Sequence, residues 1–205
     1  MNRGFTVVEI LVTLVVMAII LTLGTVNLRG SLANGRDSER KSDIESIARG
    51  LEQRYENGNA IRALPVTPVN DWPDSTAYGK GWYPGVNELR HMQGQNMSGF
   101  NPTSVSGGYL SRNLPGTSDS IITTPNGNAI IPVCTSSCAA AGNNSQISNA
   151  LGSDRDKYVY EPITDTGAVC LTGICTSYKL YWVSEVDTTT YKGIAGLKEA
   201  KSKHQ

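Results

Sequence analysis

The N-terminal region holds the feature that most constrains this chain: a long apolar run with a single ionisable side chain inside it. Between Arg3 and Arg29 the only such side chain is Glu9. As an α-helix, residues 4–28 would be about 37 Å long at 1.5 Å per residue, enough to cross a bilayer. A charge within hydrocarbon costs about 3 kcal/mol on insertion scales. Glu9 therefore needs a compensating partner, unless it lies near a membrane face and reaches water.

A different periodicity follows the apolar run. Apolar residues recur at intervals of three and four, which predicts one apolar stripe on a helix: Ile44, Ile47, Ala48, Leu51 and Tyr55. The pair Asn57-Gly58 then predicts the end of the helix. We expect one long helix from Phe5 to about Asn57, apolar on every face at first and amphipathic afterwards, with its stripe packed on a globular head.

Composition limits the classes of function. The chain has 205 residues, with 18 basic and 18 acidic side chains, so its net charge is zero. Without a basic excess, nucleic acid is not indicated as a partner. Removing the apolar run leaves enough chain for one modest domain. Residues 98–135 carry few charges and are rich in Gly, Ser, Thr and Asn, which predicts turns and loops.

The four cysteines favour an oxidising, exported location, because they follow a membrane-type segment and are even in number. They are Cys134, Cys138, Cys170 and Cys175. Their spacings lack the paired two-residue intervals of zinc sites, so disulfides are the better interpretation. We expect the local pairs Cys134–Cys138 and Cys170–Cys175, since each lies in a loop-like stretch. The crossed pairings stay open.

The C-terminal half predicts a small antiparallel sheet. Residues 157–161 and 177–186 alternate as strands and would form a long hairpin, and residues 129–133 would add an edge strand because Pro132 excludes a central one. Between residues 58 and 128 we expect a variable loop region. Its aromatics would anchor it to the head, or else be exposed: Trp72, Tyr78, Trp82 and Tyr83. The tail, residues 198–205, should be frayed.

The sequence predicts no enzyme, cofactor or resident metal. The chain has only two histidines, and it has neither a nucleophile-elbow motif nor a phosphate-binding Gly-rich motif. Asp154 and Asp156 are weak candidates for calcium, but they lack the spacing and central glycine of an EF-hand loop. Solvated loop acids are the plainer interpretation of both.

The N-terminal motif Gly4-Phe5-Thr6-Val7-Val8-Glu9, followed by an unbroken apolar run, resembles the processing motif of type IV pilins and pseudopilins. Residues 37–55 also resemble the continuation of the helix in many pilins. The resemblance covers roughly the first quarter of the chain. It implies a type IV pilin-like α+β fold divided as follows: leader 1–4, apolar helix 5–28, amphipathic helix 29–57, loop region 58–128, sheet head 129–197 and tail 198–205.

The resemblance also implies a life cycle. A prepilin peptidase would cut after Gly4, and the new amine of Phe5 would be methylated. The precursor would wait in the cytoplasmic membrane until an assembly ATPase and platform protein add it to an extracellular helical homopolymer. Glu9 would pair with the Phe5 amine of a neighbouring subunit. Phe5 and Glu9 are four residues apart and so share a helix face. Whether the fibre serves adhesion, twitching motility or DNA uptake stays open.

Three alternatives to a pilus subunit remain. A pseudopilin of a type II secretion or DNA-uptake system would use the same stem. A membrane-anchored enzyme or binding domain would use the stem only as an anchor, although Glu9 is then unexplained. A secretory signal cut after Ala33 would release a soluble domain beginning at Asn34. The apolar run is far longer than the usual core of such signals, and it contains Glu9.

Overall fold

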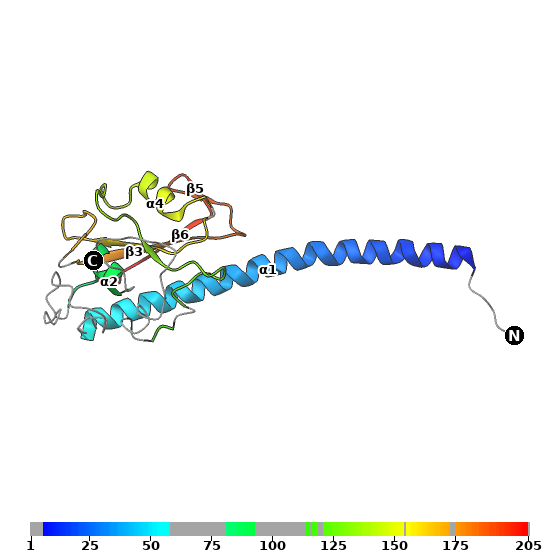
Figure 1. Ribbon diagram of the computed structural model, residues 1–205, viewed down its shortest axis with the longest axis horizontal. Coiled ribbons are helices and arrows are strands. Elements are labelled where there is room, and N and C mark those ends of the chain that lie inside the picture. Colours follow the sequence, from blue (N-terminus) through cyan, green and yellow to red (C-terminus); the bar gives the residue numbers. More distant parts are fainter. Residues whose placement is uncertain are drawn as a thin grey trace.

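The computed structural model describes residues 6–57, 81–92, 114, 116–118, 121–153, 155–172 and 175–204, without the side chains of 24–27 and 91–92. One helix dominates it (Figure 1): α1, Val7–Asn57, has 51 residues and extends far beyond the head on its N-terminal side. At 1.5 Å per residue α1 is about 77 Å long. The expected single helix, apolar first and amphipathic second, is confirmed.

The C-terminal half of α1 lies against the head along the predicted stripe. Ile44, Ile47 and Leu51 are each no more than 1% exposed. Ala48 and Tyr55 pack at the margin of the same cluster. These residues fall on one face because the helix repeats every 3.6 residues. Burial of that face attaches the head to the stem.

The head contains a four-stranded sheet in the order β1-β2-β3-β6. Its strands are β1 (Ile131–Pro132), β2 (Val159–Ile163), β3 (Ser177–Val183) and β6 (Leu197–Lys201). β2 pairs antiparallel with β3, and β3 pairs antiparallel with β6. The predicted α+β class is confirmed. The prediction of a purely antiparallel sheet is wrong, because the edge strand β1 runs parallel to β2.

The predicted strands are present with shifted ends. β2 begins two residues later than expected and continues through Pro162. Proline is tolerated there because β1 pairs only with Val159 and Tyr160, so no ladder N–H is needed on that side of Pro162. β3 ends at Val183, three residues early, where Ser184 begins a loop toward α1.

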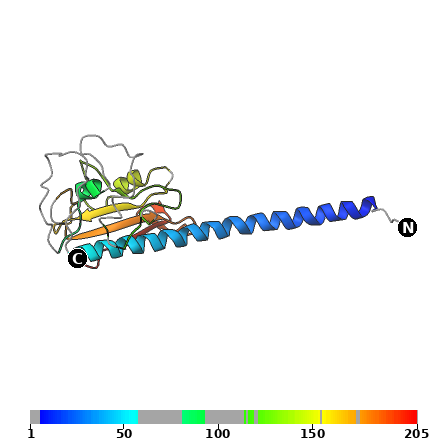
Figure 2. The same ribbon diagram turned by 60° about the horizontal axis from the view of Figure 1, so that its bottom comes forward.

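Both faces of the sheet are covered (Figure 2). One face packs on α1 and presents Tyr158, Tyr160, Tyr178 and Leu180. The other face presents Val159, Tyr181 and Leu197. These side chains pack on Val133, Ile147 and Leu151. The last two of these belong to α4 (Asn144–Leu151), which Asn143 caps by accepting a hydrogen bond from Gln146 N. The head is therefore three layers: α1, sheet, and α4 with its loops.

The prediction of a frayed tail is wrong. Residues 197–201 form β6, which pairs with β3 over five residues. The remaining described residues of the tail continue onto α1, where Lys203 N donates to Glu52 Oε1 at 3.1 Å. A short hairpin, β4 (Thr190–Tyr191) with β5 (Ile194–Ala195), precedes β6 and was not expected.

The expected loop region contains one element in its described part, α2 (Val86–Met92). Trp82 and Tyr83 are buried, at 7% and 0% exposed, and Tyr83 forms an antiparallel bridge with Cys175. These two aromatics anchor the segment to the head as predicted. Trp72 and Tyr78 lie outside the described residues.

Candidate assembly site: the exposed stem and its junction with the head

The N-terminal half of α1 (residues 7–32, the stem) is an exposed apolar helix. From Val7 to Leu32 the large apolar side chains that the structure describes are between 48% and 82% exposed. Figures 1 and 2 show this part of the helix projecting away from every other element. Of the helices in the described part of the chain, α1 is the one long and apolar enough to cross a membrane. Exposed apolar surface on this scale marks a membrane or protein contact.

Glu9, the only acidic residue in this half of α1, caps the start of the helix. Glu9 Oε2 accepts hydrogen bonds from Thr6 N and Thr6 Oγ1, both at 2.9 Å, and Glu9 N donates to Thr6 Oγ1 at 3.2 Å. This reciprocal arrangement is a capping box, with Thr6 as N-cap and Glu9 three residues later. This capping box was not predicted, although the Thr-x-x-Glu spacing is a sufficient signal for it.

The capping box leaves part of the Glu9 carboxylate available. Within the described residues, Oε1 of Glu9 makes no hydrogen bond, and the side chain is exposed. The negative charge also lies at the positive end of the helix dipole. Gly4 and Phe5, the predicted cleavage and methylation positions, lie outside the described residues.

Where the stem meets the head, Asp37 holds the loop that follows β3. Its carboxylate accepts from the backbone N–H of Glu185 at 2.9 Å and of Val186 at 3.1 Å, and from Ser184 Oγ. Partial burial acts against ionisation, but these hydrogen bonds outweigh it and keep the pKa of Asp37 below its ordinary value. The loop is thereby fixed on the helix at the level of residue 37.

Arg40 lies at the centre of this junction and is 3% exposed. Its guanidinium contacts three carboxylates: Asp156 at 2.9 Å, Glu185 at 2.7 Å and Asp37 at 3.1 Å. Burial disfavours its charge, but these partners outweigh that effect and raise the pKa of Arg40. The burial of Arg40 was not predicted from the sequence, because charges around an amphipathic helix ordinarily face water.

Further along α1, the buried carboxylate of Glu52 contacts four groups from the head and the tail. Glu52 is 5% exposed. It accepts from the hydroxyls of Tyr83 at 2.9 Å and Tyr178 at 3.1 Å, and from Lys203 N at 3.1 Å. His204 Nε2 lies 3.6 Å from the same carboxylate. Glu52 therefore ties the end of α1 to the sheet and to the chain's last residues.

The cysteines are joined in the two local pairs, Cys134–Cys138 and Cys170–Cys175. Cys170 and Cys175 are almost fully buried in the core between α1 and the sheet, and they close the loop of the β2–β3 hairpin. Cys134 and Cys138 are half-buried on the opposite side of the sheet.

The calcium interpretation of Asp156 finds no support in its surroundings. The carboxylate accepts from Arg40 at 2.9 Å, and from Thr124 Oγ1 and Asn128 Nδ2 at 3.0 Å. Burial acts against ionisation, but Arg40 and the amide donors lower the pKa of Asp156. Asp154 lies outside the described residues, and within them no three acidic, histidine or cysteine side chains gather as a metal site. Asp156 instead attaches the turn around Asn128 to α1.

Comparison with known proteins finds a match at the N-terminal end of the chain. Residues 1–25 match the family model described as the prokaryotic N-terminal methylation motif. Neither the curated proteins nor the solved structures gave a match to the chain. This motif is the hallmark of type IV pilin and pseudopilin precursors, so the predicted resemblance is confirmed.

The long apolar helix followed by a small mixed sheet with large loops is consistent with the type IV pilin-like α+β fold. Type IV pilins form a structural, non-enzymatic family. The motif implies processing by a prepilin peptidase and handling by pilus assembly machinery in general, and with the apolar helix it supports a membrane-anchored precursor.

Proposed function

We propose that this protein is a structural subunit of a type IV pilus. A prepilin peptidase cuts it after Gly4, the amine of Phe5 is methylated, and the subunit moves from the cytoplasmic membrane into an extracellular filament through its stem. The observation that carries the proposal is the exposed apolar half of α1, joined to a folded head and bearing the methylation motif at its start.

The exposed stem supports self-association. Before assembly, lipid covers the apolar surface between Val7 and Leu32. After extraction, other stems of the same kind offer a matching apolar surface of that length, and burial of apolar area is the main driving force of association. Heads then lie outside a core of helices, as the one-sided attachment of the head to α1 permits.

In the proposed filament, Glu9 forms an ion pair with a neighbouring subunit. Cleavage converts the amide nitrogen of Phe5 into a positively charged amine next to Thr6, at the same end of α1 as the Glu9 carboxylate. Oε2 of Glu9 caps its own helix, and Oε1 accepts from the amine of an adjacent subunit. An unpaired carboxylate in an apolar bundle is strongly penalised, so a subunit docks stably only where this pair forms.

A pseudopilin of a type II secretion or DNA-uptake system is the alternative, because pseudopilins share the motif. The large head with a loop region poor in charge favours a surface pilus. A secreted or membrane-anchored binding domain is less well supported, since it gives no role to Glu9 or to methylation.

The experiment separates the charge of Glu9 from its capping function. Glu9→Gln keeps a residue that can complete the capping box but removes the negative charge. Glu9→Ala removes both, and Thr6→Val removes the N-cap hydroxyl while keeping the charge. We expect both Glu9 variants to insert in the membrane, be processed, and yield few or no filaments in sheared preparations from the native host. Thr6→Val should retain filaments.

Mass spectrometry of the purified fibre provides the second readout. A mature chain beginning at methylated Phe5 within long surface fibres supports a pilus subunit, and short periplasmic assemblies support the pseudopilin. A mature chain beginning at Asn34 would contradict both. Normal fibres from Glu9→Gln would show that the capping hydrogen bonds, and not the charge, matter for assembly.

A further inference from the structure

The side of the sheet away from α1 carries a group of lysines around α4. Figure 1 shows α4 and the β4–β5 hairpin on that side of the sheet, with α1 on the other. Residues 121–153, which include α4, contain no charged side chain. The charge of this surface therefore comes from the strands and the hairpin beside α4.

Two of these lysines come together beside Gly142, which precedes α4. A Cβ atom placed on Gly142 would lie 3.0 Å from Lys192 Nζ and 3.7 Å from Lys179 Nζ. The two ammonium groups are thus no farther apart than the sum of these distances. Lys192 Nζ also donates to Gly142 O at 2.9 Å. Among the described residues, neither lysine forms an ion pair. Their like charges repel, and an anion between them would relieve the repulsion.

The backbone favours this arrangement at two positions. The φ angle of Lys192 is 51°, in the left-handed region where most side chains other than asparagine and aspartate are uncommon. Gly142 has a φ angle of 78°, and its missing side chain leaves open the space beside both ammonium groups. A lysine that tolerates an unfavourable φ and a glycine that leaves room thus meet at one point.

The carboxylate closest in register to Lys179 is already used within the fold. Glu161 is the cross-strand partner of Lys179 between β2 and β3, but it is fully buried. Its oxygens accept from Gly142 N at 2.7 Å and from the Tyr181 hydroxyl at 2.8 Å. Glu161 offsets part of the positive charge, and it is not exposed to exchange partners with solvent.

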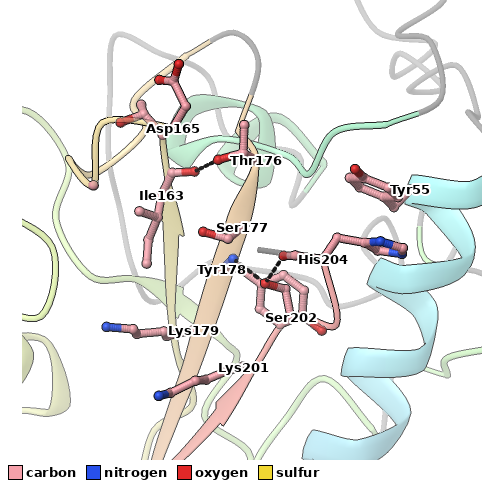
Figure 3. Close-up of a pocket in the computed structure, with 12 residues that line it drawn as sticks. Tyr55, Ile163, Asp165, Thr176, Ser177, Tyr178, Lys179, Lys201, Ser202 and His204 are labelled. Carbon is pink, nitrogen blue, oxygen red and sulfur yellow. Dashed lines mark hydrogen bonds between the residues drawn. The ribbon is translucent and has the colours of Figure 1, made fainter.

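A third lysine and a second acid extend the same surface. Lys201 on β6 is the partner of Lys179 on the other side of β3, and Figure 3 shows their side chains side by side. Lys201 contacts Glu199 at 3.3 Å, and Glu199 also accepts from the Tyr191 hydroxyl. With Lys192 included, three lysines face two carboxylates at this part of the surface, and positive charge is in excess.

Another lysine lies at the opposite end of α4. Lys157 Nζ would be 3.2 Å from a Cβ atom placed on Gly152, the C-cap of α4. The helix has eight residues, so its ends are about 12 Å apart. Between them α4 exposes only hydroxyl and amide side chains: Asn144, Ser145, Ser148 and Asn149. The surface therefore presents positive charge at two separated points, with neutral hydrogen-bonding groups between them.

We propose that this surface binds an acidic polysaccharide, a chain of sugars that carry carboxylates at regular intervals. One carboxylate lies between Lys179 and Lys192 and accepts charge-assisted hydrogen bonds from both. A carboxylate further along the polymer reaches Lys157, and sugar hydroxyls between them bond to the exposed side chains of α4. An extended polymer is needed because the two ends of α4 are too far apart for one small ligand.

Single-stranded nucleic acid fits this surface less well, because its bases stack on a series of aromatic side chains. Among the described residues around α4, the one exposed aromatic is Tyr191, at 43%. In a filament with the stems inside, the α4 side of the head lies outward, where a polymer could reach it. That orientation rests on the proposed function, whereas binding by the separate subunit does not.

Calorimetric titration of the full chain in uncharged detergent micelles tests the proposal, with polygalacturonate as the probe. Its methyl ester has the same backbone without the charge, and oligothymidylate of equal charge represents nucleic acid. We expect polygalacturonate to bind, more weakly as salt increases, and both comparisons to bind at least about tenfold more weakly. The triple variant Lys157→Gln, Lys179→Gln and Lys192→Gly should lose at least about tenfold, since exposed ion pairs contribute up to about fivefold each.

The matched control removes three positive charges from the other side of the head: Lys41→Gln, Arg49→Gln and Lys203→Gln, all exposed. It should bind polygalacturonate as the unaltered chain does. The single variant Lys192→Gly, in which glycine suits the positive φ angle, should stay folded and weaken binding about threefold.

Equal losses in the two triple variants, equal binding by the methyl ester or by oligothymidylate, or no binding of polygalacturonate would each overturn the proposal. An unchanged affinity in Lys192→Gly would overturn the role of the lysine pair at Gly142. None of these results bears on filament assembly, which depends on the stem.

Discussion

Tyr158 donates a hydrogen bond to Asp43 across the interface between the sheet and α1, with 2.8 Å between the hydroxyl oxygen and Oδ2. Asp43 is 7% exposed. Burial and, to a lesser degree, the nearby charge of Glu39 raise the pKa of Asp43 to about 6, against the opposing effect of the Tyr158 hydrogen bond. The stem and the head therefore meet at a carboxyl group that titrates in mildly acidic solution.

The sign of the resulting pH dependence follows from proton binding. Between about pH 4 and pH 6 the folded chain holds a proton on Asp43 that the unfolded chain has released, so this group's contribution to stability falls as pH rises. We predict that Asp43→Asn stabilises the chain at pH 7 by roughly 1–2 kcal/mol, since water reaches part of the site and reduces the full effect. Near pH 4 the variant should match the unaltered chain.

Thermal unfolding of the full chain in detergent, followed by tryptophan fluorescence, measures this difference at both pH values. Glu45→Gln is the matched control because Glu45 is exposed on the same helix, and it should change neither value by more than about 0.5 kcal/mol. An Asp43→Asn variant that is less stable at pH 7 would show that the ionised carboxylate is the stabilising form.

Arg40 provides the second prediction. Arg40→Met should destabilise the chain by about 3–5 kcal/mol, because three carboxylates at the junction lose their shared buried cation. Arg36→Met is the control: Arg36 also pairs with Glu185, but it is 38% exposed, and exposed pairs contribute about 1 kcal/mol or less. The midpoint of thermal unfolding compares them, and equal losses would contradict a special role for the buried arginine.

The features that the sequence predicted are local ones. The apolar run and the stripe from Ile44 to Tyr55 define α1 without reference to the rest of the chain. The capping box of Thr6 and Glu9 is equally local and was available from the spacing. What could not be predicted depends on distant partners. Arg40 is buried only because Asp156 and Glu185, more than a hundred residues away, meet it at the junction.

The sheet shows the same limit. Residues 197–201 read Leu-Lys-Glu-Ala-Lys, with too few β-branched and aromatic residues to indicate a strand. They form β6 because β3 presents a free edge for pairing. The β4–β5 hairpin turns at Lys192 and Gly193, whose φ angles are 51° and 76°. Positive φ at both positions is typical of a tight hairpin turn, but Lys-Gly is a weaker signal for it than Asn-Gly.

Burial distinguishes the two disulfides and gives the third prediction. Cys170 and Cys175 are 1% and 0% exposed, whereas Cys134 and Cys138 are half-buried at the surface. Under limited reduction of the folded chain, we expect Cys134–Cys138 to be reduced and alkylated first, because thiol exchange needs access to the sulfur. Peptide mapping by mass spectrometry follows both pairs. Alkylation of all four cysteines at one common rate would mean that reduction requires global unfolding.

Replacing the buried pair should also cost stability. The variant Cys170→Ser with Cys175→Ser loses a short-loop disulfide worth about 2 kcal/mol in the chain-entropy account, and it places two hydroxyls in an apolar core. Cys134→Ser with Cys138→Ser serves as the comparison, since it closes a loop of similar length at the surface. We expect the smaller loss of thermal stability from the surface pair.

The fifth prediction concerns β6, most of which was expected to lie in a frayed tail. Removing residues 197–205 should prevent the head from folding, because Leu197 is 2% exposed and the strand covers one edge of β3 over five residues. Removing only residues 203–205 is the control: it loses the hydrogen bond from Lys203 N to Glu52 and the stacking of His204 on Tyr55. That shorter deletion should cost about 1–2 kcal/mol and leave the head folded.

Near-UV circular dichroism and protease resistance report the folded head. If both truncated chains retained equal signal and resistance, β6 would be dispensable, and the edge of β3 would be stable without its partner.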